Sequence, residues 1–265
     1  MRAIAEMPHE VAAGIQVVLA DIDDTITTEG RLTAEAYTAL ENLHNAGIRV
    51  APVTGRPAGW CDMIARFWPV DGVVGENGAF YYAYDPLGKK MIRKQHDALE
   101  AHLKNPNRFD TIKKRIEVEV PGAAISADQP FRLADLAVDF CEDVPALEPA
   151  DIARIQTIFE QEGAIAKVSS IHVNGWFGVY DKLTMSRRFA ADILGLNIET
   201  QNASVVFVGD SPNDAPMFGF FTNSCGVANV LDFKDSLPAA PKWVTTQKGG
   251  AGFVQIAERL LSARS

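Results

Sequence analysis

The sequence predicts an α/β protein with a doubly wound parallel-sheet core and an inserted α+β cap domain. Near both ends of the chain, short apolar segments alternate with helical segments, which is typical of a parallel sheet covered on both faces. Two of these apolar segments end abruptly in aspartates. Between them the pattern changes to strands joined by turn residues, as in antiparallel sheets.

The first part of the chain predicts three strands and two helices. Gln16–Ala20 is an apolar run that ends in Asp21-Ile22-Asp23-Asp24-Thr25, so it reads as a buried strand with carboxylates at its carboxyl end. Thr33 is a suitable cap for the following helix, and Pro57 suits a first helical turn. The expected order is strand 16–20, helix 33–45, strand 48–52, a helix after Pro57 and strand 71–74.

The middle of the chain predicts the cap. Asp85-Pro86-Leu87-Gly88 is a turn-rich connection between two strand-like runs, so we expect a hairpin. Helices and short strands then follow in mixed order. The expected division is core 1–82, cap 83–180 and core 181–265. In the segment that follows residue 78 we expect strands 79–84 and 89–94, helix 97–116, strands 122–127 and 132–139, helix 149–162, and strands 164–168 and 170–180.

The last part of the chain returns to alternating helices and strands. We expect a helix 182–194, a strand 204–208, a helix after Asp214, short strands near Cys225 and Trp243, and a helix 253–262. The glycine-rich segment 248–252 lacks the spacing of a phosphate-binding P-loop, so a flexible connection is expected there.

Composition limits the classes of partner and compartment. The 265 residues carry a formal net charge of −9, which argues against nucleic acid and against an anionic membrane surface as partners. The three cysteines form no closely spaced pair, and no apolar run approaches the ~20 residues that span a bilayer. We therefore expect a cytoplasmic protein, either a monomer or a homodimer.

The aspartates at two strand ends indicate a metal-dependent site. Parallel strands deliver their carboxyl ends to one edge of the sheet, so Asp21, Asp23, Asp210 and Asp214 should converge there. Such a cluster requires a cation, and oxygen ligands alone suit Mg²⁺. Two carboxylates can then divide the chemistry, one as nucleophile toward phosphorus and the other as general acid and base. Thr54 and Lys182 are natural donors toward a phosphoryl group.

Four motifs in this order resemble the haloacid dehalogenase superfamily of phosphatases. They are Asp21-Ile-Asp-Asp-Thr25, Val53-Thr-Gly-Arg56, Asp181-Lys182 and Gly209-Asp-Ser-Pro-Asn-Asp214. The insert is similar in position and size to the cap of Cof-type subfamily IIB, and residues 75–79 look like the segment that leads into that cap. The fourth motif is also similar to those of mannosyl-3-phosphoglycerate and sucrose phosphate phosphatases.

The resemblance implies a role for each matching residue. Asp21 would be the nucleophile, Asp23 the general acid and base, and Thr54 and Lys182 phosphate ligands. Mg²⁺ would be held by Asp21, the backbone carbonyl of Asp23, Asp210 and Asp214. Further contacts with the substrate would come from Gly55, Arg56, Asn77 and Asn213.

Strand alternation adds two residues of the cap. His172 and Asn174 share one face of the predicted strand 170–180, and that face either meets the substrate or is an ordinary polar sheet surface.

The function expected from these residues is Mg²⁺-dependent hydrolysis of a phosphomonoester through an aspartyl-phosphate intermediate. A cap over the site favours a small phosphorylated metabolite, and the fourth motif favours a sugar phosphate. Two alternatives stay open, namely a phosphomutase of the phosphomannomutase type and a phosphate- or metal-binding domain without turnover.

Overall fold

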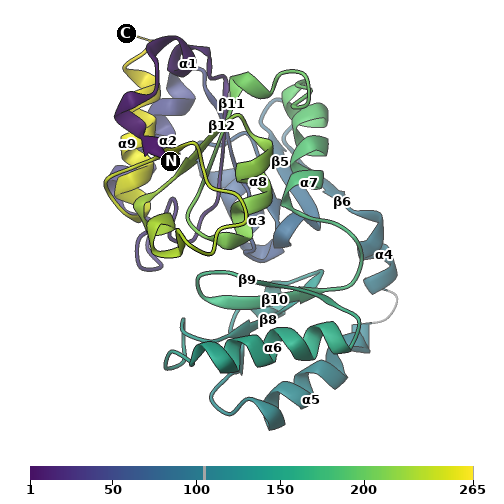
Figure 1. Cartoon of the computed structure of the whole chain (residues 1–265). Coiled ribbons are helices and arrows are strands. Elements are labelled where there is room, and N and C mark those ends of the chain that lie inside the picture. Colours follow the sequence, from purple (N-terminus) through teal and green to yellow (C-terminus); the bar gives the residue numbers. More distant parts are fainter. Residues whose placement is uncertain (104–105, 265) are drawn as a thin grey trace.

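The computed structural model describes residues 1–103 and 106–264. Figure 1 shows two parts, one above the other. The upper part contains the parallel sheet and both termini, and the lower part contains a smaller sheet with helices beneath it. The predicted fold class, a parallel core with an α+β insertion, is confirmed.

The core sheet has six strands, and every pairing in it is parallel. The central pair, β2 and β11, consists of buried apolar residues throughout, which is why both strands are visible in the sequence. In spatial order the strands are β1 (Arg2–Ala3), β13 (Trp243–Val244), β12 (Asn223–Gly226), β11 (Val205–Gly209), β2 (Val17–Ala20) and β3 (Arg49–Pro52).

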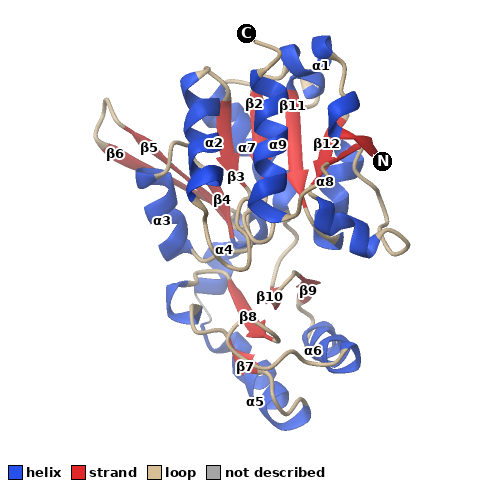
Figure 2. Ribbon diagram, turned by 90° about the vertical axis from the view of Figure 1, so that its left-hand side faces the viewer, coloured by secondary structure: helices blue, strands red, loops and turns tan. Residues whose placement is uncertain are grey.

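Helices cover both faces of this sheet. Along β2, Val18 and Ala20 pack in the cluster that includes side chains of α2 (Ala34–Asn45) and α9 (Gly249–Leu261), beside α1 (His9–Gly14). Val17 and Leu19 point the opposite way, into the cluster formed with α7 (Lys182–Phe189) and α8 (Ala215–Phe220). Figure 2 shows α2 and α9 in front of the sheet and α7 behind it.

A three-stranded sheet extends the core on the side of β3. It consists of β4 (Val73–Gly75), β5 (Phe80–Asp85) and β6 (Lys90–Gln95), with α3 (Ala58–Phe67) packed against it. Phe80 and Tyr82 pack in one core cluster, and Tyr81 and Ala83 in the other. The predicted boundary between residues 82 and 83 therefore falls inside β5. The division into core and cap remains a proposal.

The lower part has a four-stranded antiparallel sheet in the order β7 (Ala124–Ile125), β8 (Asp135–Asp139), β10 (His172–Trp176) and β9 (Ile165–Val168). Its apolar face packs on α5 (Asp110–Glu119) and α6 (Pro149–Gln161) through residues such as Leu136, Val138 and Val173. By alternation, Asp135, His172 and Asn174 lie on the opposite face. That face meets the core.

Two expectations from the sequence need correction. The helix expected at 97–116 is divided into α4 (Asp97–Leu103) and α5, and residues 104–105 lie outside the described residues. The glycine-rich segment is not a flexible connection, because it forms the first turn of α9. Gly250 packs there so closely that an added Cβ would lie 2.7 Å from the carbonyl oxygen of Ile26.

The strands of the cap are also shorter than the sequence suggested; β10, for example, ends at Trp176. Among the described residues, no helix combines the length and the apolar character that crossing a membrane requires.

Candidate active site

Three buried carboxylates meet where β2 and β11 end. Asp21 follows β2 directly, and its backbone N–H donates to the carbonyl of Val208 in β11 at 2.9 Å. Asp210 follows β11, and Asp214 lies one turn later. One carboxylate oxygen from each residue lies within 4.8 Å of the others. The structure thus brings together three of the four predicted metal ligands.

Lys182 is the cation of this cluster. It begins α7, where Asp181 caps the helix by accepting the backbone N–H of Thr184 at 2.7 Å. Its Nζ lies 3.0 Å from Oδ2 of Asp21 and 2.9 Å from Oδ1 of Asp214. Three carboxylates therefore face one buried ammonium group, which leaves an excess of negative charge.

The pKa values reflect this excess. Burial, together with the charges of Asp214 and Asp23, outweighs the attraction of Lys182 and raises the pKa of Asp21 to about 7. Burial and the two neighbouring carboxylates raise the pKa of Asp210 well above its usual range. Burial opposes the charge on Lys182, but Asp21 and Asp214 outweigh it and raise the pKa of the amine. A hard divalent cation would relieve this repulsion, and the all-oxygen donor set fits Mg²⁺.

Asp23 points away from the acid cluster, toward Arg56. The Arg56 guanidinium donates to Asp23 Oδ1 at 2.7 and 2.9 Å and to Oδ2 at 3.1 Å. It also donates to Glu142 of the cap at 2.7 Å and stacks over the ring of Trp60 at 4.4 Å. The predicted metal contact of Asp23 is through its backbone carbonyl, and it stays a prediction. Arg56 joins a core acid to a cap acid.

Thr54 and Gly55 lie just after the end of β3, where the six-stranded core sheet faces the four-stranded sheet of the lower part. Thr54 is fully buried, and its Oγ1 accepts the backbone N–H of Arg56 at 3.0 Å, so its hydroxyl hydrogen points elsewhere. The backbone carbonyl of Gly55 accepts a hydrogen bond from the Arg132 guanidinium of the cap at 2.9 Å. An added Cβ at Gly55 would lie 3.2 Å from Nδ2 of Asn77, so these two positions are in contact.

Asn77 and Asn213 lie where two cavities adjoin. Asn77 adopts a left-handed backbone with φ of 55°, and its Nδ2 is buried without a hydrogen-bond partner among the described residues. Asn213 is held by Ser211, whose hydroxyl donates to its Oδ1 at 2.8 Å. A small cavity of about 10 Å³ and a larger one of about 300 Å³ both include Asn77 and Asn213 in their walls.

The structure brings His172 and Asn174 to the small cavity, together with Asp21, Asp23 and Arg56. Nε2 of His172 lies 3.0 Å from Oε2 of Glu142, at an angle outside the hydrogen-bond range. Asn174 donates to Asp135 at 3.0 Å. The face of β10 that alternation singled out is therefore the face toward the acids, and a role in binding substrate remains a proposal.

Two acids were missed by the sequence analysis. Glu142 follows β8 in an acidic loop, Cys141-Glu142-Asp143, which repeats the pattern of acids after a buried strand. Glu76 is fully buried, and its carboxylate accepts four backbone N–H groups, those of Ala58, Leu133, Ala134 and Asp135. It joins the core to the segment before β8. In the sequence, the only signal for a special role of Glu76 is that the Glu76-Asn77 pair lies between two glycines, Gly75 and Gly78.

The family comparison agrees with this geometry. A family model described as haloacid dehalogenase-like hydrolase matches residues 18–114, the segment with Asp21, Asp23, Thr54 and Asn77. Over these residues the chain is similar to haloacid dehalogenase-like hydrolases. Asp210, Asp214 and Lys182, which lie beside Asp21 in the structure, are outside the matched segment. None of the curated proteins compared matches the chain.

Solved structures show that this haloacid dehalogenase-like fold extends over nearly the whole chain. A protein of Thermoplasma acidophilum has 18% identity and a TM-score of 0.70, covering 93% of this chain and 98% of its own. A HAD/COF-like hydrolase from Plasmodium vivax has 16% identity and a TM-score of 0.66, with 96% and 99% covered. The sucrose-phosphatase of Synechocystis, in complex with sucrose and phosphate, has 15% identity and a TM-score of 0.61, with 93% and 98% covered.

Proposed function

We propose that this protein is a Mg²⁺-dependent phosphomonoester hydrolase in which Asp21 forms an aspartyl-phosphate. The observation that supports this most directly is the buried excess of carboxylates at the ends of β2 and β11, with Lys182 as their ammonium partner. A phosphoryl group and a divalent cation together complete such a site electrostatically. Asp21, Asp210 and Asp214 would hold the cation, which would offset negative charge on the phosphoryl oxygens.

In the first half of the reaction, a carboxylate oxygen of Asp21 attacks phosphorus. The bond from phosphorus to the leaving oxygen breaks, and its electron pair stays on that oxygen, which takes a proton from Asp23. The ammonium group of Lys182 and the free hydroxyl hydrogen of Thr54 offset the charge that spreads over the phosphoryl oxygens.

In the second half, Asp23 removes a proton from water as the water oxygen attacks the aspartyl-phosphate. Asp21 leaves as a carboxylate, inorganic phosphate is released, and Asp23 holds the proton for the next cycle. The hydrogen bonds from Arg56 compete with that proton for the Asp23 oxygens, so the acid step requires Arg56 to release part of its contact.

The substrate class proposed is a small phosphorylated metabolite. The cap sheet lies over the acids and leaves little room for a phosphoprotein or a polymer. Sugar phosphates are the first class to test, because the fourth motif resembles sugar phosphate phosphatases and one structural neighbour is a sucrose-phosphatase.

The decisive experiment measures phosphate release from a panel of phosphorylated metabolites and a generic aryl phosphate. Asp21→Asn should lower turnover at least ~1,000-fold, because the amide is not a nucleophile. The matched control is Asp232→Asn, an exposed acid paired with Lys248 on the surface, which should keep full activity. Unchanged turnover in Asp21→Asn would remove Asp21 as nucleophile.

The same assay separates the two rivals. A phosphomutase would convert a hexose 1-phosphate to its isomer without releasing inorganic phosphate. A binding domain without turnover would release no phosphate from any compound.

A further inference from the structure

The turn between β4 and β5, residues 76–78, has an unusual backbone. Glu76, Asn77 and Gly78 all have a positive φ, at 42°, 55° and 103°. Glycine adopts this left-handed region freely and asparagine tolerates it, but for a glutamate it costs free energy. Other contacts must therefore hold Glu76 in this conformation.

The side chain of Glu76 supplies those contacts. Its Oε1 accepts the N–H of Ala58, at the start of α3, at 2.9 Å. Its Oε2 accepts the N–H groups of Ala134 at 2.5 Å and Asp135 at 3.3 Å, and the N–H of Leu133 lies 2.9 and 3.1 Å from the two oxygens. Three of the four donors belong to the cap, so the turn is fixed to the core and to the cap at once.

The same turn is bonded to the segment that follows β3. The N–H of Asn77 donates to the carbonyl of Thr54 at 3.0 Å, and the N–H of Glu76 donates to the carbonyl of Arg56 at 3.2 Å. Thr54 is a predicted phosphate ligand. A shift of the turn would therefore move the backbone of this segment as well.

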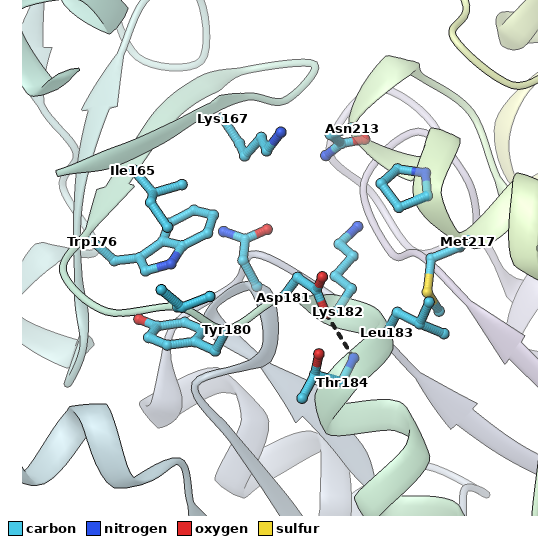
Figure 3. Close-up of a pocket in the computed structure, with 13 residues that line it drawn as sticks. Ile165, Lys167, Trp176, Tyr180, Asp181, Lys182, Leu183, Thr184, Asn213 and Met217 are labelled. Carbon is cyan, nitrogen blue, oxygen red and sulfur yellow. Dashed lines mark hydrogen bonds between the residues drawn. The ribbon is translucent and has the colours of Figure 1, made fainter.

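On its other side, the turn packs against the start of α7. An added Cβ at Gly78 would lie 2.0 Å from the carbonyl oxygen of Asp181 and 3.0 Å from the backbone nitrogen of Lys182. Figure 3 shows Asp181 and Lys182 at this point, with the hydrogen bond from the N–H of Thr184 to Asp181. The turn thus lies between the backbones of two predicted phosphate ligands, Thr54 and Lys182.

The side chain of Asn77 faces the site from this turn. It lines both adjoining cavities, and its Nδ2 is buried without a hydrogen-bond partner among the described residues. A buried N–H group without an acceptor costs free energy. An oxygen of a bound phosphoryl group would be such an acceptor.

We propose that Glu76 is a positioning residue of the phosphoryl site: its carboxylate fixes the left-handed turn, and the turn directs the amide of Asn77 toward the phosphoryl group. The proposal rests on the hydrolase function proposed above and on the phosphoryl contact that the family resemblance implies for Asn77. Glu76 is fully buried, so it acts through Asn77 and does not touch the substrate. The amide is directed in this way only while residues 133–135 of the cap are bound to Glu76.

Glu76→Gln is the first test. Whichever way the new amide turns, its NH₂ group faces at least two of the four N–H donors. The measurements use the full-length protein with Mg²⁺ at about pH 9, where Glu76 is charged, because burial and the charge of Asp135 raise its pKa to about 8. The variant should lower kcat/KM for an aryl phosphate at least ~10-fold and raise the Kd for inorganic phosphate at least ~5-fold.

The matched control is Asp71→Asn. Asp71 pairs with Arg49 and accepts the N–H of Val50, at the opposite end of β3 from Thr54. Its loss should lower stability but leave kcat/KM and the Kd for phosphate unchanged. Equal losses of activity in both variants would overturn the proposal, because lower stability would then account for the effect of Glu76→Gln.

A double-mutant cycle tests whether Glu76 acts through Asn77. Asn77→Gly removes the amide and keeps a residue that adopts a positive φ freely. In this background, Glu76→Gln should lower kcat/KM by less than ~3-fold, because no amide remains to be directed. A loss of at least ~10-fold in both backgrounds would overturn the proposal.

A measurement on the wild type keeps the test valid if Glu76→Gln does not fold. If the contacts of Glu76 favour phosphate binding, bound phosphate must favour those contacts by the same factor. Inorganic phosphate should therefore slow hydrogen exchange of the Ala134 N–H at least ~3-fold more than that of Val173, which pairs with Val138 in the same cap sheet. Equal slowing of both would overturn the proposal.

The outcomes for the two proposals are distinguishable. If the folded wild-type protein binds phosphate but hydrolyses no ester, the hydrolase function fails, and phosphate binding and hydrogen exchange still decide the role of Glu76. If it hydrolyses esters and Glu76→Gln is fully active, only the positioning role fails.

Discussion

The acids of the core edge and the acids at the boundary with the cap are equally buried but differently satisfied. At the core edge, the carboxylate of Asp210 accepts one hydrogen bond among the described residues, from Thr25 at 3.4 Å. At the boundary, Asp128 accepts from Ser126 and twice from Arg132, and Glu76 accepts four backbone N–H groups.

This difference separates acids bonded by many protein donors from acids that, in the proposed function, would hold a cation. Hydrogen bonds from protein donors offset part of the cost of burying a carboxylate, although burial and the charge of Asp135 still raise the pKa of Glu76 to about 8. A carboxylate that faces other carboxylates with few donors costs free energy to bury, and a bound cation would offset that cost. Burial alone therefore does not distinguish the two groups of acids, whereas the number of hydrogen-bond donors separates Asp210 from Glu76 and Asp128.

Removal of divalent metal should have the largest effect on activity. It should act on the acids of the core edge and not on those at the boundary with the cap. We expect EDTA to lower phosphate release at least ~1,000-fold and added Mg²⁺ to restore it, because Lys182 is the only cation paired with Asp21 and Asp214 in the described part of the chain. Thermal unfolding with and without Mg²⁺ should show stabilisation by the ion in the wild type. Activity that survives EDTA would show that the core acids need no metal.

Lys182→Met should destabilise the metal-free protein by ~3–5 kcal/mol, because it removes the ammonium group that faces Asp21 and Asp214. Urea unfolding in EDTA measures this loss. The matched control is Lys248→Met, whose amine pairs with Asp232 on the surface and should change the free energy of unfolding by less than ~1 kcal/mol. Equal losses of stability in both variants would contradict the conclusion that the ammonium group of Lys182 stabilises the buried carboxylates.

Neutralising one acid in each region should change stability in opposite directions. Asp135→Asn should lower the free energy of unfolding by ~2 kcal/mol, because Asp135 accepts from both Arg132 and Asn174. Asp210→Asn should raise it by ~1 kcal/mol in EDTA, because it removes repulsion from Asp21 and Asp214. Chemical denaturation of both variants without metal makes the comparison. A lower free energy of unfolding in both variants would mean that the hydrogen bonds of Asp210 outweigh its repulsion from the neighbouring carboxylates.

The smallest effect is expected from Glu142→Gln. The contact with His172, opposed by burial and reinforced by Arg56, lowers the pKa of Glu142 to about 2. A lowered folded pKa adds stability that is present above the unfolded value near 4.5 and is lost as the pH falls toward 2.

Glu142→Gln should therefore cost up to ~1 kcal/mol at pH 7 and progressively less between pH 4.5 and 2. Thermal unfolding across this range measures the difference, with the exposed neighbour Asp143→Asn as the control. A difference from wild type that does not change with pH would exclude the ion pair as its cause.

The sequence was most informative where chemistry follows a strand end. Asp21 and Asp210 could be placed beside each other because parallel strands align their carboxyl ends, and Lys182 because it follows the insertion. Glu142 and Glu76 could not be placed, because their partners lie across the boundary between two sheets whose mutual orientation no local pattern encodes. The packing of Gly250 against the carbonyl of Ile26 was also hidden, because close approach of two backbones leaves no periodic signal.

That glycine contact has a consequence for the order of events in folding. Gly250 donates its N–H to the carbonyl of Thr27 at 3.0 Å and to the hydroxyl of Thr28, 222 residues earlier in the chain. Thr27 and Thr28 continue the loop that begins with Asp21. Contacts of such long sequence separation form slowly, because the entropy of closing the loop precedes any gain. During synthesis, the loop that begins with Asp21 would therefore be made early but acquire its supporting contacts only after α9 has emerged, so activity should appear late.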